Sequence, residues 1–166
     1  RRRAGRVINL TCPRVSRVHS IVKKYSSRGY FIIILGDRDH AEVQGIMSQA
    51  TGGVKVISTL DEVREIPRAG KYAVVAQTTL DITFFDRAVG EIEKSFSDVT
   101  VINTICDATS SRQNDLIEAI DRGVDAIVVV GDRNSANTRR LAAIGTERGI
   151  RTFHVETEDE LSAEDF

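Results

Sequence analysis

The chain contains two cysteines, and both follow apolar segments with related sequences. Residues 7–11 (VINLT) precede Cys12, and residues 101–105 (VINTI) precede Cys106. A helix is expected to begin after each cysteine, and Pro13 is a favoured residue at a first helical position. A thiol at a helix N-terminus ionises readily because the helix dipole and the free N–H groups stabilise the thiolate. Such a thiolate is a good ligand for iron or zinc.

The similarity between these two segments extends beyond the cysteines. Each block continues through a helical stretch to an Arg-Gly pair, and then to an apolar strand that ends in Gly-Asp-Arg, at residues 36–38 and 131–133. A repeated module puts equivalent residues at equivalent places. Both cysteines are therefore expected at the carboxyl ends of corresponding strands, where open α/β sheets bind ligands. The alternative is that both are small residues buried at strand ends.

A histidine and a glutamate follow the first Gly-Asp-Arg loop. One residue separates His40 from Glu42, so both side chains could reach a cleft at the end of the preceding strand. A carboxyl group in that position could act as a general acid if its surroundings raise its pKa. The alternative is a surface histidine beside a glutamate that favours the start of a helix.

Hydroxyl and amide side chains follow two other strands. Thr78 and Thr79 come directly after the predicted fourth strand, where a hydroxyl can relay protons, bind phosphate or simply cap a helix. Ser135 and Asn137 lie in the second Gly-Asp-Arg loop, at the place that His40 and its neighbours occupy in the first. Such side chains, together with free N–H groups at a helix start, can bind an anion. The alternative role is again capping.

The composition is that of an ordinary globular protein. The 166 residues are 41% hydrophobic and 28% charged, and the formal net charge of −1 gives no support for binding nucleic acid. No apolar run approaches the roughly 20 residues of a membrane helix, and the three arginines at the start are not followed by the apolar core of a signal peptide. We therefore expect a cytoplasmic protein whose cysteines serve metal binding or thiol chemistry.

Short β-branched runs bounded by turn residues alternate with helical patterns along the chain. Several strands are apolar almost throughout, which is typical of a parallel sheet covered on both faces. The predicted fold class is α/β, as two repeated three-layer modules with mostly parallel sheets, at residues 1–97 and 98–166. The expected strands are 6–10, 31–35, 54–57, 72–76, 99–102, 126–130 and 151–155.

The ordered set of segments resembles the LytB/IspH family, the 4-hydroxy-3-methylbut-2-enyl diphosphate reductases of the non-mevalonate isoprenoid pathway. Each piece alone is weak, but together they follow the family order over nearly the whole chain. The matching pieces are Thr11-Cys12-Pro13 with Val18-His19, Gly36 with His40-Ala41-Glu42, Gln77-Thr78-Thr79-Leu80, Cys106-Asp107-Ala108-Thr109 with Arg112-Gln113, and Asn134-Ser135-Ala136-Asn137 with Arg140-Leu141.

The resemblance implies three α/β modules in a pseudo-symmetric arrangement around a central 4Fe-4S cluster, with one cysteine ligand from each module. Cys12 and Cys106 match two of these ligands. The first module, with the third cysteine, and a C-terminal segment with a further phosphate-binding serine have no counterpart here. The chain is therefore expected to be a fragment that covers the second and third modules and is inactive by itself.

The roles of the family's residues carry over to matching positions in this chain. The resemblance implies that His40 contacts the substrate diphosphate and that Glu42 is the proton source. It further implies that Thr78 relays the proton to the substrate hydroxyl. Thr79 would help to order the pocket around the substrate.

The second Gly-Asp-Arg loop matches the family's remaining diphosphate-binding residues, with one departure. The resemblance implies that Ser135 and Asn137 bind the diphosphate. Ala136 stands between them where the family usually has a second serine, so one hydrogen bond to the diphosphate would be lost or come from the backbone. Asp37 and Arg38 also differ from the small or neutral residues often found there. These departures leave room for a weaker or altered enzyme.

The implied reaction is a two-electron reductive dehydroxylation of a small allylic diphosphate to isopentenyl or dimethylallyl diphosphate. The implied electron donor is a ferredoxin or a flavodoxin, and neither nucleic acid nor membrane is an expected partner. We also expect the fragment to associate with itself, because the absence of one module would expose apolar surface.

Two other functions compete with this interpretation. The chain could be a module that binds a diphosphate or a phosphosugar without redox chemistry, in which case Cys→Ser substitutions would leave phosphate affinity unchanged. It could also be a structural scaffold with buried cysteines, in which case the thiols would resist alkylation in the folded state and the chain would take up no iron.

Overall fold

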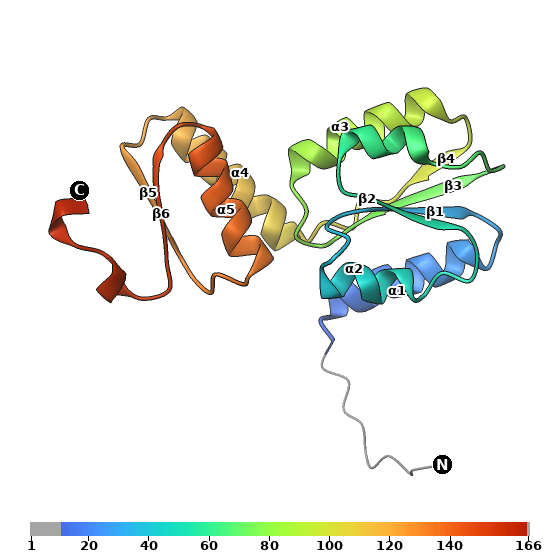
Figure 1. Cartoon of the computed structure of the whole chain (residues 1–166), viewed down its shortest axis with the longest axis horizontal. Coiled ribbons are helices and arrows are strands. Elements are labelled where there is room, and N and C mark those ends of the chain that lie inside the picture. Colours follow the sequence, from blue (N-terminus) through green and yellow to red (C-terminus); the bar gives the residue numbers. More distant parts are fainter. Residues whose placement is uncertain (1–10, 166) are drawn as a thin grey trace, which may run out of the picture. The chain divides into compact units, whose positions relative to one another are not determined.

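The computed structural model describes residues 11–165, which form two compact units (Figure 1). The first unit contains residues 11–77 and 91–104, and the second contains the segment 78–90 together with the chain from Ile105 onward. The boundary predicted after Ser97 differs from this division, because the strand that follows Ser97 pairs with a strand of the first unit. The predicted strand at 6–10 lies outside the described residues.

A four-stranded parallel sheet with the order β2-β1-β3-β4 forms the first unit. The predicted strands at 31–35, 54–57 and 72–76 are confirmed residue for residue, and the predicted strand at 99–102 ends one residue earlier. The elements are α1 (Pro13–Ser26), β1 (Phe31–Leu35), α2 (Ala41–Met47), β2 (Val54–Ile57), the 3-10 helix η1 (Leu60–Glu65), β3 (Tyr72–Ala76), the last turn of α3 (Ile82–Ser95) and β4 (Val99–Val101).

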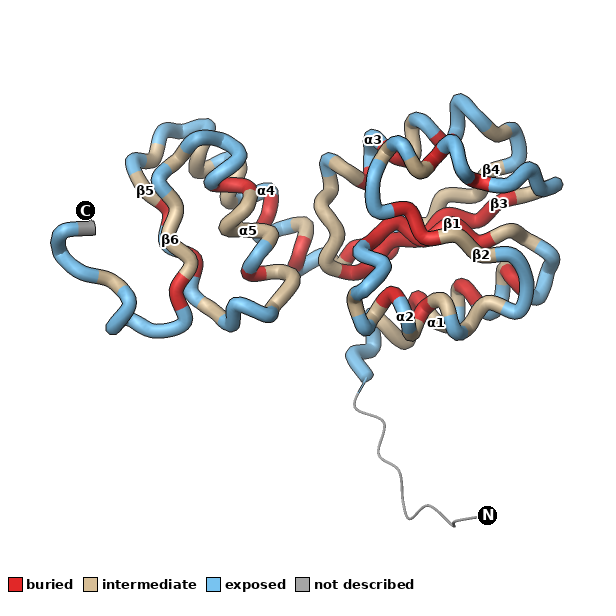
Figure 2. The backbone as a smooth tube through the Cα atoms, viewed as in Figure 1, coloured by how far each residue is buried: buried red, intermediate tan, exposed pale blue. Residues whose placement is uncertain are grey.

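The two central strands β1 and β3 are buried on both sides (Figure 2). Their β-branched residues suit a pleated, fully covered position, and central parallel strands are apolar on both faces for this reason. On one face they meet α1 and α2, which lie together against the sheet (Figure 1). That part of the core consists of Val18, Val22, Ile32, Ile34, Val43, Ile46, Val56, Ala73 and Val75.

The strand order creates a topological switch point between β1 and β3. From β1 the chain passes through α2 to β2 on one side, and it then returns to β3 on the other side of β1. The connections at the carboxyl ends of β1 and β3 therefore diverge. Open α/β sheets bind ligands in the crevice that forms at such a point, so the fold itself marks this edge of the sheet as a candidate site.

The second unit is smaller and contains two parallel strands, β5 and β6, packed with α4 and α5. The strands predicted at 126–130 and 151–155 are confirmed. The unit differs from the predicted three-layer arrangement, because Val128 and Val130 of β5 are 39% and 67% exposed. The elements are most of α3, α4 (Asp107–Asp121), β5 (Ala126–Val130), α5 (Ala136–Glu147), β6 (Arg151–Val155) and the 3-10 helices η2 (Glu158–Glu160) and η3 (Ala163–Asp165).

Both units confirm the predicted α/β class with parallel strands. Within the part of the chain that the structure describes, no helix has the length and apolar character needed to cross a bilayer. The exposed valines of β5 are the kind of surface that favours association, but self-association itself stays a prediction.

Gly145 allows α5 to pack tightly in the second unit. A Cβ atom at this position would lie 2.4 Å from Thr152 Oγ1 and 2.8 Å from Ile127 Cδ1. We predict that Gly145→Ala lowers the free energy of unfolding by about 1–3 kcal/mol, because α5 must move away from the strands. Urea unfolding followed by circular dichroism measures the change.

The matched control is Gly90→Ala in α3, where a Cβ atom would meet nothing within 4 Å. It should leave the stability unchanged or raise it by about 0.5–1 kcal/mol, since alanine has the higher helix propensity. Equal stabilities for the two variants would contradict the packing described for Gly145.

Candidate functional site

Both cysteines stand at the N-cap of a helix with similar backbone geometry. Cys12 precedes α1 with φ −51° and ψ 133°, and Cys106 precedes α4 with φ −68° and ψ 129°. Neither side chain makes a capping hydrogen bond, and both thiols are free. Cys12 is exposed and Cys106 is half-buried. The interpretation of the cysteines as buried structural residues is therefore wrong for Cys12.

Free thiols that make no capping hydrogen bond are available as metal ligands, and cysteine sulfur is a preferred donor for iron and zinc. Among residues 11–165, however, no three His, Cys, Asp or Glu side chains gather in a way that could hold a metal ion. The chemistry of the donors fits iron or zinc, but the ligand set is incomplete within either unit.

His40 and Glu42 lie together at the start of α2. His40 is the N-cap residue, and its Nδ1 atom accepts a hydrogen bond of 3.2 Å from the backbone N–H of Glu42. The neutral imidazole therefore carries its proton on Nε2, which makes Nε2 a donor. Both side chains are half-buried. The arrangement presents a hydrogen-bond donor and a carboxyl group at the carboxyl end of β1.

A close contact between the ends of β1 and β3 holds the loop that leads to His40. Gln77 is only 4% exposed, and its Oε1 atom accepts a hydrogen bond of 3.0 Å from the backbone N–H of Asp37. A Cβ atom on Gly36 would lie 2.9 Å from Gln77 Cβ and 3.0 Å from Val43 Cγ2. Only glycine fits there without a shift of backbone or side chain. The sequence had suggested Gln77 as part of a motif, but not this positioning role.

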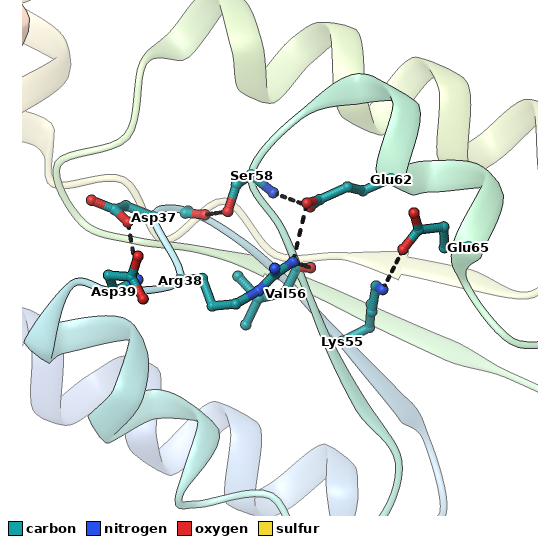
Figure 3. A network of polar contacts seen from close by, with 9 residues as sticks. Asp37, Arg38, Asp39, Lys55, Val56, Ser58, Glu62 and Glu65 are labelled. Carbon is teal, nitrogen blue, oxygen red and sulfur yellow. Dashed lines mark hydrogen bonds and ion pairs between the residues drawn. The ribbon is translucent and has the colours of Figure 1, made fainter.

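A polar network holds the same loop from its other side (Figure 3). The guanidinium of Arg38 donates to Glu62 Oε1 at 3.1 Å and to the carbonyl oxygen of Val56 at 3.3 Å. The other oxygen of Glu62 accepts from the backbone N–H of Ser58 at 2.7 Å, and Ser58 Oγ donates to the carbonyl of Gly36 at 2.8 Å. The loop is thereby linked to β2 and η1.

The hydrogen bond from Ser58 to Glu62 also sets the acidity of this carboxyl group. That bond, followed by the charge and hydrogen bond of Arg38, holds the pKa of Glu62 below its ordinary value of 4.5, although partial burial opposes the shift. Glu62 is therefore ionised at neutral pH and binds Arg38 as a carboxylate. Arg38 thus has a structural role in fixing the loop before His40.

In the second unit, Thr78 and Cys106 are joined by a backbone hydrogen bond. The carbonyl oxygen of Thr78 accepts from the N–H of Cys106 at 2.8 Å, and Thr78 itself is 6% exposed. Thr79 follows and is half-buried. The bond holds the segment after β3 beside the cysteine at the start of α4.

Gln113 of α4 supports this segment, and sequence reasoning gave it no role. It is fully buried; its Nε2 donates to the carbonyl of Leu80 and its Oε1 accepts from the N–H of Ile82, both at 3.3 Å. A signal for it was present in the sequence: Gln113 precedes the apolar positions Leu116, Ile117 and Ile120 at helical spacing and so shares their side of the helix. A buried amide at such a position must satisfy its hydrogen bonds locally.

Ser135 and Asn137 lie at the start of α5. Ser135 is the N-cap residue, and its hydroxyl accepts from the N–H of Thr138 at 3.4 Å. The Oδ1 atom of Asn137 is buried and accepts no hydrogen bond from the described residues. Asn137 also lines a shallow hollow of about 380 Å³ together with Arg112 of α4. A buried polar atom without a partner is costly, and such atoms often mark places where another group binds.

An ion pair between Arg140 and Asp81 connects α5 to the segment after Thr79. Arg140 also binds Glu147 of its own helix at 2.9 Å, and its side chain is only 23% exposed. Asp81 in turn accepts a hydrogen bond of 2.6 Å from the N–H of Phe84 in the first turn of α3. The elements that carry Thr78, Cys106 and Ser135 are thus linked through polar contacts within one unit.

The structure brings some predicted site residues together and separates others between the units. His40 lies with Glu42, Thr78 lies with Cys106, and Ser135 lies with Asn137. Three of the eight predicted residues belong to the first unit and five to the second. Neither unit therefore contains the predicted site by itself. The first-unit residues are Cys12, His40 and Glu42; those of the second are Thr78, Thr79, Cys106, Ser135 and Asn137.

Comparison with known proteins identifies the family to which this chain belongs. The family model for LytB protein matches residues 1–166. The chain belongs to the LytB family. The match includes both cysteines and every other predicted site residue, so the resemblance found in the sequence is confirmed at the level of the family.

Two relatives illustrate the similarity within the LytB family. The 4-hydroxy-3-methylbut-2-enyl diphosphate reductase of Geobacter sulfurreducens is 43% identical over 162 residues, which cover 98% of this chain and 57% of that protein. The reductase of the same name from Aquifex aeolicus is 39% identical over 169 residues, which cover 58% of its length. The chain therefore spans somewhat more than half the length of these relatives.

Two solved structures share the fold. The E-1-hydroxy-2-methyl-but-2-enyl-4-diphosphate reductase from Plasmodium falciparum gives a TM-score of 0.87 at 27% identity, over 93% of this chain and 49% of that one. An (E)-4-hydroxy-3-methyl-but-2-enyl diphosphate reductase, described as the terminal enzyme of the non-mevalonate pathway, gives 0.62 at 40% identity, over 97% of this chain and 58% of that one.

The network around Glu62 predicts how the first unit responds to acid. Because the folded-state pKa of Glu62 lies below its ordinary value of 4.5, its contribution to stability is present above that value and is lost as the pH falls through the lower folded-state value. We predict that Glu62→Gln lowers the free energy of unfolding at pH 7 by about 1 kcal/mol. The deficit relative to the parent should shrink on acidification.

Urea unfolding between pH 7 and pH 3 measures this difference. Glu93→Gln is the control, because Glu93 is exposed on α3 and the same substitution there should leave stability unchanged at every pH. A constant difference between parent and Glu62→Gln across this range would show that the carboxylate does not contribute through its charge.

Proposed function

We propose that the chain is the part of a 4-hydroxy-3-methylbut-2-enyl diphosphate reductase that contributes two cysteine ligands to a 4Fe-4S cluster. The observation that carries the proposal is the matched pair of free cysteines, Cys12 and Cys106, each at the N-cap of a helix. Cysteine sulfurs are the usual ligands of such clusters, and neither of these side chains is used for helix capping. The names of the relatives at about 40% identity support the same activity.

In the complete protein, the diphosphate would be bound by His40, Ser135 and Asn137. His40 presents Nε2 as a donor because its Nδ1 atom accepts the N–H of Glu42. Ser135 and Asn137 present a hydroxyl and an amide at the N-terminus of α5, where the free N–H groups and the helix dipole favour an anion. Ala136 contributes no hydroxyl, so its backbone N–H is what remains for the diphosphate at that position.

The proposed reaction replaces the substrate hydroxyl by hydrogen, with two electrons and two protons consumed and one water released. When bound, the cluster supplies the electrons and a Lewis-acidic iron for the hydroxyl oxygen. Glu42 holds the proton that the leaving oxygen needs, and the Thr78 hydroxyl relays it. Thr79 orders the pocket. The second proton goes to the carbon framework, which gives isopentenyl or dimethylallyl diphosphate.

The proposal also includes an electron donor and the expectation that the isolated chain is inactive. Electrons would come from a ferredoxin or a flavodoxin. By itself the chain should be inactive, because Cys12 and Cys106 are its only cysteines and a cluster of this kind needs more protein ligands.

The cysteines are tested by iron and sulfide content after anaerobic reconstitution of the complete protein. We expect Cys12→Ser and Cys106→Ser each to lose most of the bound iron and sulfide, since a hydroxyl is a poor replacement for a thiolate. The matched control is Ser27→Ala, an exposed position at the other end of α1, which should keep full iron.

The opposite result would favour the redox-free alternative. If both cysteine variants retained full iron, Cys12 and Cys106 would not be the cluster ligands. If the parent took up no iron while still binding inorganic diphosphate, the chain would be a diphosphate-binding module. Unchanged diphosphate affinity in the cysteine variants would then support that reading.

Glu42 is tested separately from the cluster. We predict that Glu42→Gln keeps the iron content of the parent and lowers kcat by about 10²–10⁴-fold, the usual contribution of a positioned general acid. Glu93→Gln, an exposed carboxylate on α3, should change neither quantity. Turnover with a chemical reductant gives the rate without a protein donor, and undiminished kcat in Glu42→Gln would remove Glu42 from the proton path.

A further inference from the structure

The exposed side of α1 carries only positive charge among its ionisable residues. The helix sequence PRVSRVHSIVKKYS contains two arginines and two lysines and no acidic residue. All four cations are exposed, while Val18 and Val22 are buried in the core. Arg17 and Lys24 lie on one side of the helix, and Arg14 and Lys23 flank them. We call Arg14, Arg17, Lys23 and Lys24 the α1 basic face.

Three members of this face are not neutralised by neighbours. Arg17, Lys23 and Lys24 form no ion pair with any carboxylate in the described part of the chain, whereas Lys55 and Lys94 of the same unit each pair with a glutamate. Arg17 and Lys24 lie seven residues apart, so they share one side of the helix. Unpaired cations grouped in this way produce a positive surface potential that attracts acidic molecules.

The α1 basic face begins beside a proposed cluster ligand. Cys12 is the N-cap of α1, and Arg17 follows five residues later, which is roughly 7.5 Å along the helix axis. A protein that bound this face would therefore lie near the thiol of Cys12, which is itself exposed. An electron-donor protein must bind close to the group that it reduces.

We propose that the α1 basic face is the docking surface for an acidic electron-donor protein. The inference rests on the proposed function, because it assumes that a cluster is held at Cys12. Opposite charges on the two surfaces would steer the encounter and fix the orientation of the donor. The surface is electrostatic, so the complex should form quickly, weaken with salt and release the donor after each electron transfer.

The residues around the basic face favour a protein over a membrane. Helices that lie in a bilayer surface insert large apolar side chains below a basic face. The large hydrophobic residues exposed within the described residues are Val128 and Val130, which belong to the second unit and not to α1. Tyr25, the aromatic residue of α1, is half-buried, packs edge-on against Tyr30 and lies beneath Lys24 Nζ, so its ring is already covered and does not offer a stacking platform for nucleic acid bases.

The test uses the complete cluster-loaded protein with an acidic plant-type ferredoxin as the donor. The variant Arg17→Glu/Lys24→Glu reverses two charges of the basic face. The control Arg64→Glu/Lys94→Glu reverses two exposed charges elsewhere in the same unit. Calorimetry gives the Kd for ferredoxin, and turnover is measured once with ferredoxin and once with a chemically reduced viologen.

We expect the basic-face variant to raise the Kd and KM for ferredoxin by about tenfold or more, because charge reversal at a docking surface replaces attraction by repulsion. Turnover with viologen should stay unchanged, and the control should change neither constant by more than about twofold. The salt dependence of ferredoxin binding should also become weaker in the variant.

Unchanged ferredoxin constants in the basic-face variant, or equal effects in the control, would overturn the docking proposal. Failure of the proposed function looks different: the parent would show no turnover with viologen, whatever its affinity for ferredoxin. Binding to phosphatidylserine vesicles that disappears in the variant, with ferredoxin binding unaffected, would assign the face to a membrane surface and also overturn the proposal.

Discussion

The contact between Gly36 and Gln77 fixes the carboxyl ends of β1 and β3 against each other. Because Gly36 has no side chain, Gln77 can pack beside it and accept the N–H of Asp37. The geometry of this turn sets where α2 begins, and therefore where His40 caps it and where Glu42 stands. The Arg38 and Glu62 network supports the same turn from outside. The absence of a Cβ atom at Gly36 thus underlies the placement of His40 and Glu42.

Four of the eight proposed site residues share a physical setting. Cys12, His40, Cys106 and Ser135 are all N-cap residues of helices. Each of these residues precedes the first turn of a helix, where backbone N–H groups have no partner within the helix. The free N–H groups and positive dipole ends of these helices favour anions. Thiolates and a diphosphate are both anionic, so one structural device would serve both.

Much of this organisation could be predicted from the sequence because it is local. The strands are mostly β-branched runs between turn residues, and five of them lie where the pattern predicts. Sheet partners were harder to predict. The similarity of residues 101–105 to 7–11 suggested that β4 opens the second module, but β4 pairs with β3 in the first sheet. Similar sequences indicate similar local conformation. Strand pairing, in contrast, depends on residues that are distant in the chain. The partners of Gln113 and Arg140 could not be predicted for the same reason, because Leu80, Ile82 and Asp81 lie far from them in the chain.

The alternation of the chain between the two units has a consequence for its synthesis on the ribosome. The first unit receives its fourth strand only after residues 78–90 have been made, and those residues belong to the second unit. Neither unit is a continuous stretch of the gene. Growth of the chain therefore leaves β3 with an open edge until β4 emerges, and residues 78–90 of the second unit are made before the first unit is complete.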